Sequence, residues 1–230
     1  MTAHVVVRDF DRVDAGVAAG LAALGVSTVH EADQRRGAFA PEIRPIQSGV
    51  AIAGPAVTVL CHPGDNLMVH AAVETCRPGD IVVITTTSPS TDAMLGELLA
   101  TSLRAHGAIG VVVDAGVRDV AQLRAMGFPV WTRATSPQGT VKASPGSVNV
   151  PVVCAGRLVH PGDAIVADDD GVVVVPRARA AAVLEAGRRR EAAEVAKRER
   201  LAAGELGVDM YQLRPLLAQL GVSYLDRPPA

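Results

Sequence analysis

The chain has 230 residues, of which 49% are apolar and 20% charged, enough for one large hydrophobic core or two small ones. Its net charge of -2 and pI near 6.3 give no general attraction to nucleic acid or to an anionic membrane. Its three cysteines lack a Cys-x-x-Cys spacing, which argues against a disulfide framework and a structural zinc site.

The N-terminal segment does not have the pattern of a signal peptide. It reads MTAHVVVRDFDRVD, with acidic residues directly after a short apolar run. We expect no apolar stretch of membrane-spanning length. The sequence therefore predicts a cytoplasmic protein with no membrane partner.

The first third of the chain shows one helical pattern, two strands and a second helix. Residues 9–24 have helical apolar spacing that ends at Gly25, and residues 26–29 are typical of a short strand. Residues 52–60 form an apolar run between turn residues, which predicts a strand, and residues 67–75 can form a helix.

The tripeptide Pro-Gly-Asp occurs three times, beginning at Pro63, Pro78 and Pro161, and the last two copies lead straight into apolar runs. Proline presets the first turn angle, glycine permits a positive φ, and aspartate caps the turn. We interpret the three copies as turns before strands and not as active sites.

The middle of the chain alternates between strands and helices. The predicted order is strand 81–84, polar loop 85–92, helix to about residue 106, strand 109–113, helix 119–126 and strand 128–131. Continuous apolar strands that alternate with helices indicate β-α-β units and a parallel sheet, so the fold class is α/β.

The last third divides into hairpins and a helical tail. Short β runs in residues 151–176 predict antiparallel hairpins, and we interpret Asp168-Asp169-Asp170 as a solvated hairpin tip and not a calcium loop. Residues 177–206 predict a long helix or helix pair. The expected organisation is one α/β domain over residues 1–176 and a helical extension over 177–230 that packs on a neighbouring subunit, with no nucleic-acid partner.

Several catalytic motifs are absent from the sequence. It contains no Gly-x-Gly-x-x-Gly after a strand, no Walker A loop, no Gly-x-Ser-x-Gly and no His-Glu-x-x-His. Nucleotide enzymes, α/β-hydrolases and zinc peptidases are therefore disfavoured. The six histidines are scattered, and we expect each to be a surface or satisfied core residue.

The remaining candidates for chemistry are carboxylates and an arginine. Arg118 and Asp119 follow the strand GVVVD, and Glu97 lies near the start of the preceding helix. Asp119 could hold Mg²⁺ as its only direct protein ligand, with Glu97 reaching the ion through water. Arg118 offers a planar fork to a carboxylate or enolate oxygen, and the amides of Glu97, Leu98 and Leu99 at a helix N-terminus suit an anion. Spacing alone leaves open that Asp119 is only an N-cap and Arg118 only solvated.

The run GELLATSLRAHGAIGVVVDAGVRD (residues 96–119) resembles the RraA-like family, specifically its 4-hydroxy-4-methyl-2-oxoglutarate/4-carboxy-4-hydroxy-2-oxoadipate aldolases. The similarity continues through MGFPVWTRATSPQGTVK and PGSVNVPVVCAGRLVHPGD to the terminal LAAGELGVDMY and covers most of the chain. Many members of the family carry Asp where this chain has Glu97.

The resemblance implies a three-layer α/β sandwich with a central mixed or parallel sheet, β hairpins and a long C-terminal helical tail. It also implies a class II aldolase of microbial aromatic-acid catabolism that uses Mg²⁺, Mn²⁺ or another divalent cation. Its substrate would be a 2-oxo acid with a tertiary alcohol at C4, cleaved to pyruvate plus oxaloacetate or a second pyruvate. Oxaloacetate decarboxylation is the expected secondary activity.

The site residues that the resemblance implies are Arg118, Asp119 and Glu97 for catalysis and Asp119 for the metal. Gly96, Glu97, Leu98, Leu99 and Arg118 would bind the pyruvyl part. A homotrimer or homohexamer with sites between subunits is expected.

The general base stays open between metal-bound water, Glu31 and a glutamate of another subunit's C-terminal helix (Glu191, Glu194 or Glu199), while Lys142 could contact a distal carboxylate. The main alternative is a non-catalytic member of the same family that binds and inhibits a ribonuclease. A methyltransferase would lack its glycine-rich cofactor loop.

Overall fold

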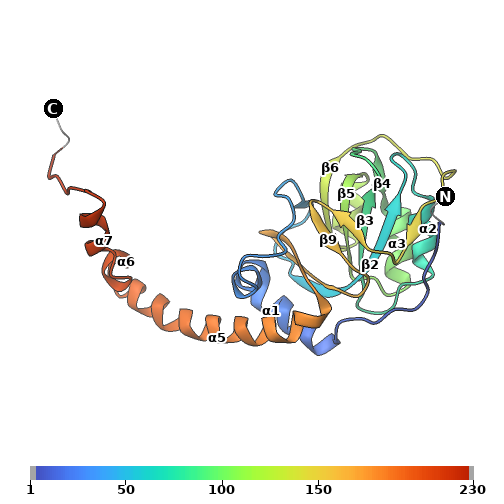
Figure 1. The fold of residues 1–230 in the computed structure, drawn as a ribbon. Coiled ribbons are helices and arrows are strands. Elements are labelled where there is room, and N and C mark those ends of the chain that lie inside the picture. The colour runs from blue at the N-terminus through green and yellow to red at the C-terminus, as the bar shows by residue number, and fades with distance from the viewer. Residues whose placement is uncertain (1–3, 228–230) are drawn as a thin grey trace. The chain divides into compact units, whose positions relative to one another are not determined.

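The computed structural model describes residues 4–227 and has a mixed α/β fold (Figure 1). Within these residues nine strands form one sheet in the order β1-β6-β5-β3-β2-β10-β11, with β4 paired to β5 and β7 paired to β2. Strands β2, β3, β5 and β6 run parallel, and β4 pairs in parallel with β5. The other pairings in the sheet are antiparallel. The predicted α/β class is confirmed.

The strands are β1 (Arg44–Pro45), β2 (Ile52–Cys61), β3 (Ile81–Thr86), β4 (Ala93–Leu95), β5 (Gly110–Val117), β6 (Val130–Thr135), β7 (Ser147–Val148), β8 (Val152–Cys154), β9 (Arg157–Val159), β10 (Ala164–Asp168) and β11 (Gly171–Val175). The helices are α1 (Ala15–Ala32), α2 (Leu67–Val73), α3 (Glu97–Ala105), α4 (Val120–Ala125), α5 (Arg177–Ala202), α6 (Gly207–Met210) and α7 (Arg214–Gln219). The hairpins predicted over residues 151–176 are present as β8–β9 and β10–β11.

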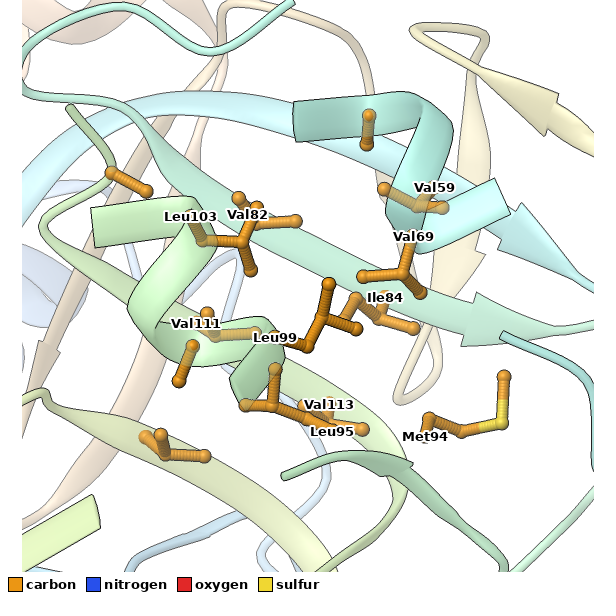
Figure 2. Packing of buried hydrophobic residues seen from close by; sticks show 14 of the residues in the cluster. Val59, Val69, Val82, Ile84, Met94, Leu95, Leu99, Leu103, Val111 and Val113 are labelled. Carbon is orange, nitrogen blue, oxygen red and sulfur yellow. The ribbon is translucent and has the colours of Figure 1, made fainter. Parts of the chain in front are cut away.

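The central strands are apolar throughout because both faces of the sheet are covered. In β5, Val111 and Val113 belong to one core cluster, whereas Val112 belongs to another. Helices α2 and α3 cover the first face, and Leu99 and Leu103 of α3 point into its core (Figure 2). The second face packs against the β8–β9 hairpin and the segment around Phe39. The site described below lies at the carboxyl ends of these strands.

Helix α1 corrects two predictions, the helix over residues 9–24 and the strand over 26–29. The helix begins at Ala15, because the Asp14 carboxylate caps it by accepting hydrogen bonds from the amides of Gly16 and Val17. Gly25 (φ 76°) kinks the helix, but residues beyond it remain helical. There the carboxylate of Asp168 accepts a hydrogen bond from the Val26 amide at 2.8 Å and so caps the second half.

Helix α1 also differs from the expectation that no apolar stretch approaches membrane-spanning length. It has 18 residues with a mean hydropathy of 1.2, sufficient in length and composition to cross a membrane. Its apolar residues instead pack in the third core cluster against β10 and β11, where Leu21 and Val29 are completely buried.

The aspartates of the β10–β11 turn also accept hydrogen bonds from other segments of the chain. The carboxylate of Asp169 accepts a hydrogen bond from the Gly49 amide, and that of Asp170 accepts one from the Ser27 hydroxyl. Together with the bond from Asp168 to α1, these contacts connect the turn to two other segments. The prediction of a solvated hairpin tip is confirmed, since Asp169 and Asp170 are exposed, and the structure adds hydrogen bonds from backbone amides and a hydroxyl to the three carboxylates.

Strand β4 corrects the predicted helix that followed the polar loop. We expected helix from the end of that loop to about residue 106, but residues 93–95 form a strand and the helix occupies Glu97–Ala105. β4 pairs in parallel with the carboxyl end of β5, where Leu95 lies opposite Val117. Three buried residues cannot be assigned from periodicity; their hydrogen bonds to β5 decide the conformation.

The chain divides into two compact units, Met1–Arg188 and Arg189–Ala230. The first turns of α5 belong to the first unit, where Ala180, Val183 and Leu184 are buried in the same cluster as α1. The second unit contains the remainder of α5 with α6 and α7, and many of its apolar side chains are exposed, such as Leu206 and Tyr224.

Candidate functional site

The site is built where β4 and β5 end side by side. The amide of Arg118 donates a hydrogen bond to the carbonyl of Leu95 at 3.0 Å, directly after the paired residues Leu95 and Val117. Gly96 and Arg118 are consequently neighbours although 22 positions separate them. Helix α3 starts at the next residue, so its N-terminal amides lie at the same edge of the sheet as the Arg118-Asp119 pair.

Asp119 adopts a backbone conformation that is rare for residues other than glycine. Its φ of 59° lies in the left-handed region, and its side chain makes no capping hydrogen bond to α4. Its Oδ2 atom instead accepts a hydrogen bond from the Glu97 amide at 3.1 Å. The structure thus rejects the interpretation of Asp119 as an ordinary N-cap, and its carboxylate connects to the start of α3.

Arg118 and Gly96 complete this arrangement. The Nε atom of Arg118 lies 3.6 Å from Oδ2 of Asp119, and both side chains are partly exposed. A Cβ atom at Gly96 would lie 2.6 Å from that oxygen and 3.1 Å from Arg118 Nε. Gly96 has extended backbone angles (φ -139°), so glycine is required here for space and not for its conformational freedom.

A cavity of about 310 Å³ opens beside these residues. Of the predicted site residues, Gly96, Leu98, Leu99, Arg118 and Asp119 line it. Glu97 does not; its Oε1 accepts a hydrogen bond from the Thr101 hydroxyl of the same helix at 3.1 Å. The structure therefore brings Arg118 and Asp119 together with the helix terminus, while Glu97 contributes its backbone amide.

A second part of the cavity wall was missed by sequence reasoning, apart from Lys142. Asn66 and His70 come from the start of α2, and Thr140 and Lys142 from the loop before β7. We expected every histidine to be a surface or satisfied core residue; His70 is exposed, as expected, and it also lines the cavity. The order of elements could have predicted the contribution of α2. This helix follows β2 and therefore begins at the same carboxyl edge of the sheet as α3.

Two groups on this wall have unusual electrostatics. Partial burial and the positive charge of Lys142 lower the pKa of His70 from its ordinary 6.5, which favours a neutral imidazole at pH 7. Asn66 donates a hydrogen bond from Nδ2 to the Met94 carbonyl at 3.3 Å, but its buried Oδ1 has no hydrogen-bond partner within residues 4–227. The cavity therefore combines a cation, a neutral base and an unused acceptor.

The other candidates for chemistry lie elsewhere. Glu31 does not line the cavity and forms an ion pair with Arg35 at 3.0 Å on the surface. In the second unit, Glu194 pairs with Arg190 at 2.9 Å. Burial, as the largest cause, raises the pKa of the Cys61 and Cys76 thiols to about 12, so neither is a nucleophile at neutral pH.

Among the residues that the structure describes, no group of three or more His, Cys, Asp or Glu side chains could hold a metal ion. A hard cation bound by one carboxylate, with water and substrate at its other positions, is compatible with Asp119.

Comparison with known proteins identifies relatives over most of the chain. A family model of the RraA-like proteins, described as Aldolase/RraA, matches residues 7–174. A Halalkalibacterium halodurans protein named "Putative 4-hydroxy-4-methyl-2-oxoglutarate aldolase" is 33% identical over 169 residues, covering 74% of this chain and 80% of that protein. A protein of the same name from Burkholderia multivorans is 37% identical over 134 residues, covering 58% of this chain and 81% of that protein.

The fold has a relative among solved structures as well. The crystal structure of Streptomyces coelicolor RraAS2, described as an unusual member of the RNase ES inhibitor RraA protein family, has a TM-score of 0.73 and 29% sequence identity. The similarity covers 83% of this chain and 99% of that chain. Because the family model matches well over half of the residues, this chain belongs to the RraA-like family.

Proposed function

We propose that this protein is a divalent-metal-dependent lyase that cleaves 4-carboxy-4-hydroxy-2-oxoadipate and 4-hydroxy-4-methyl-2-oxoglutarate. The observation that carries the proposal is the meeting of the α3 N-terminus, Arg118 and Asp119 at one cavity. The names of the two bacterial relatives support the reaction class.

The residues present fit Mg²⁺, or Mn²⁺, held by a single carboxylate. Oδ2 of Asp119 is occupied by the Glu97 amide, and its Oδ1 has no partner among residues 4–227, which leaves an oxygen donor at the cavity. Oxygen ligands suit a hard cation. When bound, the ion would act as a Lewis acid on the 2-oxo group of the substrate.

The chain's own groups would bind and orient the pyruvyl part. The amides of Leu98 and Leu99 lie in the first turn of α3. The helix contains no residue four positions before them whose carbonyl could accept their hydrogen bonds. They and the helix dipole suit the substrate's C1 carboxylate. The Arg118 guanidinium can donate hydrogen bonds to the oxygen that becomes negative when the C3–C4 bond breaks and pyruvate enolate forms.

Cleavage needs a base for the proton of the C4 hydroxyl and an acid that protonates C3 of the enolate. On the cavity wall, the neutral imidazole of His70 can accept a proton, and Lys142 can contact a distal carboxylate. We add His70 to the earlier candidates for the base, which are water, Glu31 and the tail glutamates Glu191, Glu194 and Glu199 of another subunit.

The same enolate explains a second expected activity. The methyl substrate gives two molecules of pyruvate, and the carboxylated substrate gives pyruvate and oxaloacetate. Loss of CO₂ from oxaloacetate again leaves pyruvate enolate, which the same groups would stabilise. We therefore propose oxaloacetate decarboxylation at this site.

We also propose that the protein is a homotrimer or homohexamer with sites between subunits. The second unit exposes a series of apolar side chains, namely Val195, Leu201, Leu206, Tyr211, Leu213, Leu216, Leu220, Val222, Tyr224 and Leu225. So many exposed apolar groups on one segment are typical of a surface that packs against protein. Light scattering after gel filtration would give the number of subunits.

The test is pyruvate release from each substrate, measured with Mg²⁺, with Mn²⁺ and after chelation. Asp119→Asn keeps the left-handed backbone accessible and should reduce kcat by about 100-fold or more. Calorimetry should show that the variant has also lost Mg²⁺ binding. Asp170→Asn, outside the cavity, should leave both unchanged. Absence of pyruvate release under all conditions, or full activity of Asp119→Asn, overturns the proposal.

A further inference from the structure

The first Pro-Gly-Asp turn differs from the other two in what its aspartate binds. Asp65, Asp80 and Asp163 are all buried, with 2%, 0% and 5% of their surface exposed. Asp80 and Asp163 each close their own turn by accepting the amide three positions earlier, from Arg77 at 2.8 Å and His160 at 2.9 Å. Asp65 makes no such bond.

Asp65 instead connects two segments that line the cavity. Its Oδ1 atom accepts a hydrogen bond from the Leu67 amide at 2.9 Å, at the start of the helix that carries His70. Its Oδ2 atom accepts two more, from the amides of Ala143 at 2.8 Å and Ser144 at 2.6 Å. Those two residues directly follow Lys142.

The loop that carries Lys142 has few other attachments. Two backbone hydrogen bonds join it to the same turn, from Val141 to the Gly64 carbonyl at 2.9 Å and from Asn66 to the Val141 carbonyl at 3.1 Å. Its side chains bury little, since Val141 is 62% exposed and Lys142 and Ala143 are also exposed. Its position therefore depends on backbone hydrogen bonds, and one buried carboxylate accepts two of them.

The charge on Asp65 suits this task. Burial by itself would raise the pKa of Asp65, but the hydrogen bonds from Leu67, Ala143 and Ser144 outweigh it and hold the pKa below its ordinary 3.8. The carboxylate is thus ionised at neutral pH. Amide hydrogen bonds to an ionised acceptor are stronger than those to a neutral one.

We propose that Asp65 is a positioning residue of the cavity, which holds the loop of residues 140–144 so that Thr140 and Lys142 line the cavity together with the Arg118-Asp119 pair. The consequence for substrate binding rests on the proposed lyase function, whereas the consequence for the loop does not. Asp163 provides a matched control, because it is an equally buried aspartate of the same tripeptide that binds two backbone amides away from the cavity.

The first experiment measures amide hydrogen exchange and needs no substrate. In Asp65→Asn we expect the amides of Ala143 and Ser144 to exchange about tenfold faster or more, since a charged acceptor is lost. Asp163→Asn should leave both amides unchanged. If Asp65→Asn does not fold, Ala143→Pro removes one donor at an exposed position and should accelerate exchange at Ser144. Unchanged exchange in the variant that folds overturns the proposal.

The second experiment asks whether the loop acts through Lys142. We expect Asp65→Asn to raise KM for the aldol substrate about tenfold and to change kcat by less than about threefold, as does Lys142→Ala. In the Lys142→Ala background, Asp65→Asn should raise KM by less than about twofold further, because the two changes remove one interaction. Additive effects would contradict positioning. If the wild type cleaves neither substrate, the lyase proposal fails while the exchange result still decides the role of Asp65.

Discussion

At the scale of single residues, the site depends on the close approach of the Asp119 carboxylate to the backbone of Gly96 and Glu97. Asp119 takes a left-handed backbone conformation that costs about 1 kcal/mol or more in a residue with a side chain, and its carboxylate reaches the Glu97 amide. The absent side chain at Gly96 makes room for that oxygen. The strained backbone of Asp119 and the absence of a side chain at Gly96 thus both place the Asp119 carboxylate at the start of α3.

Gly96→Ala should disrupt this arrangement. The new Cβ would lie 2.6 Å from Asp119 Oδ2, so the carboxylate must move, and a displacement of about 1 Å can cost about 100-fold in rate. Gly207→Ala is the control, because its Cβ would come no closer than 3.9 Å to another side chain. Steady-state kinetics of both variants should show little or no loss for Gly207→Ala. Equal losses would count against the special role of Gly96.

The pKa of His70 should respond to Lys142. Burial and the Lys142 charge both lower it, so Lys142→Ala should raise the pKa towards 6.5, while burial keeps it below that value. Lys142→Arg retains the charge and should leave the pKa low. NMR titration of the imidazole carbon resonances measures both. A pKa that is the same in all three proteins would show that Lys142 does not act on His70.

At the scale of elements, α1 illustrates how a distant residue decides local structure. Gly25 was a reasonable helix stop, and the residues after it had a short apolar pattern that suits either a strand or a helix. The Asp168 carboxylate caps the second half of the helix from 142 positions away along the chain. A sequence pattern confined to neighbouring residues contains no information about this contact.

Asp168→Ala should therefore destabilise the protein. Loss of a helix cap costs about 1 kcal/mol, within a range of about 0.5–2, and this aspartate also accepts the Asp170 amide. Asp170→Ala removes an exposed hydrogen bond to Ser27 and should change stability by less than about 0.5 kcal/mol. Urea unfolding compares the two variants. An Asp168→Ala protein as stable as wild type would show that the Asp168 cap does not stabilise the second half of α1.

Strand β4 shows the same limit for the candidate site. The sequence placed Glu97 near a helix start and Arg118-Asp119 after a strand, which is what the structure contains. The three strand residues before Gly96 were interpreted as helix, yet their pairing with β5 is what makes Gly96 and Arg118 neighbours. Pairing between strands depends on chain segments far apart in sequence, so periodicity could not supply it.

At the scale of the whole molecule, the two compact units have different relations to the core. The first turns of α5 bury Ala180, Val183 and Leu184 against the cluster that contains α1, whereas the segment after Arg188 contributes no residue to the three core clusters of the described chain. The core therefore includes only the first turns of α5.

Truncation should separate these parts. A chain that ends at Arg188 should fold and unfold cooperatively, because all of its core residues remain. A chain that ends at Pro176 loses three buried side chains, which corresponds to several kcal/mol, and should be unfolded or strongly destabilised. Circular dichroism and thermal unfolding check both. If the protein ending at Arg188 fails to fold, the division into units is incorrect.

The sequence by itself determined the α/β class, the apolar central strands, the hairpins, the helical tail and the family, because these follow from local periodicity, turn residues and a contiguous run of 24 residues from Gly96 to Asp119. Only the tertiary structure decided the cavity. Its second wall comes from Asn66, His70, Thr140 and Lys142, which the Asp65 carboxylate connects across 79 positions. Such contacts form when distant segments pack together, and no spacing along the chain encodes them.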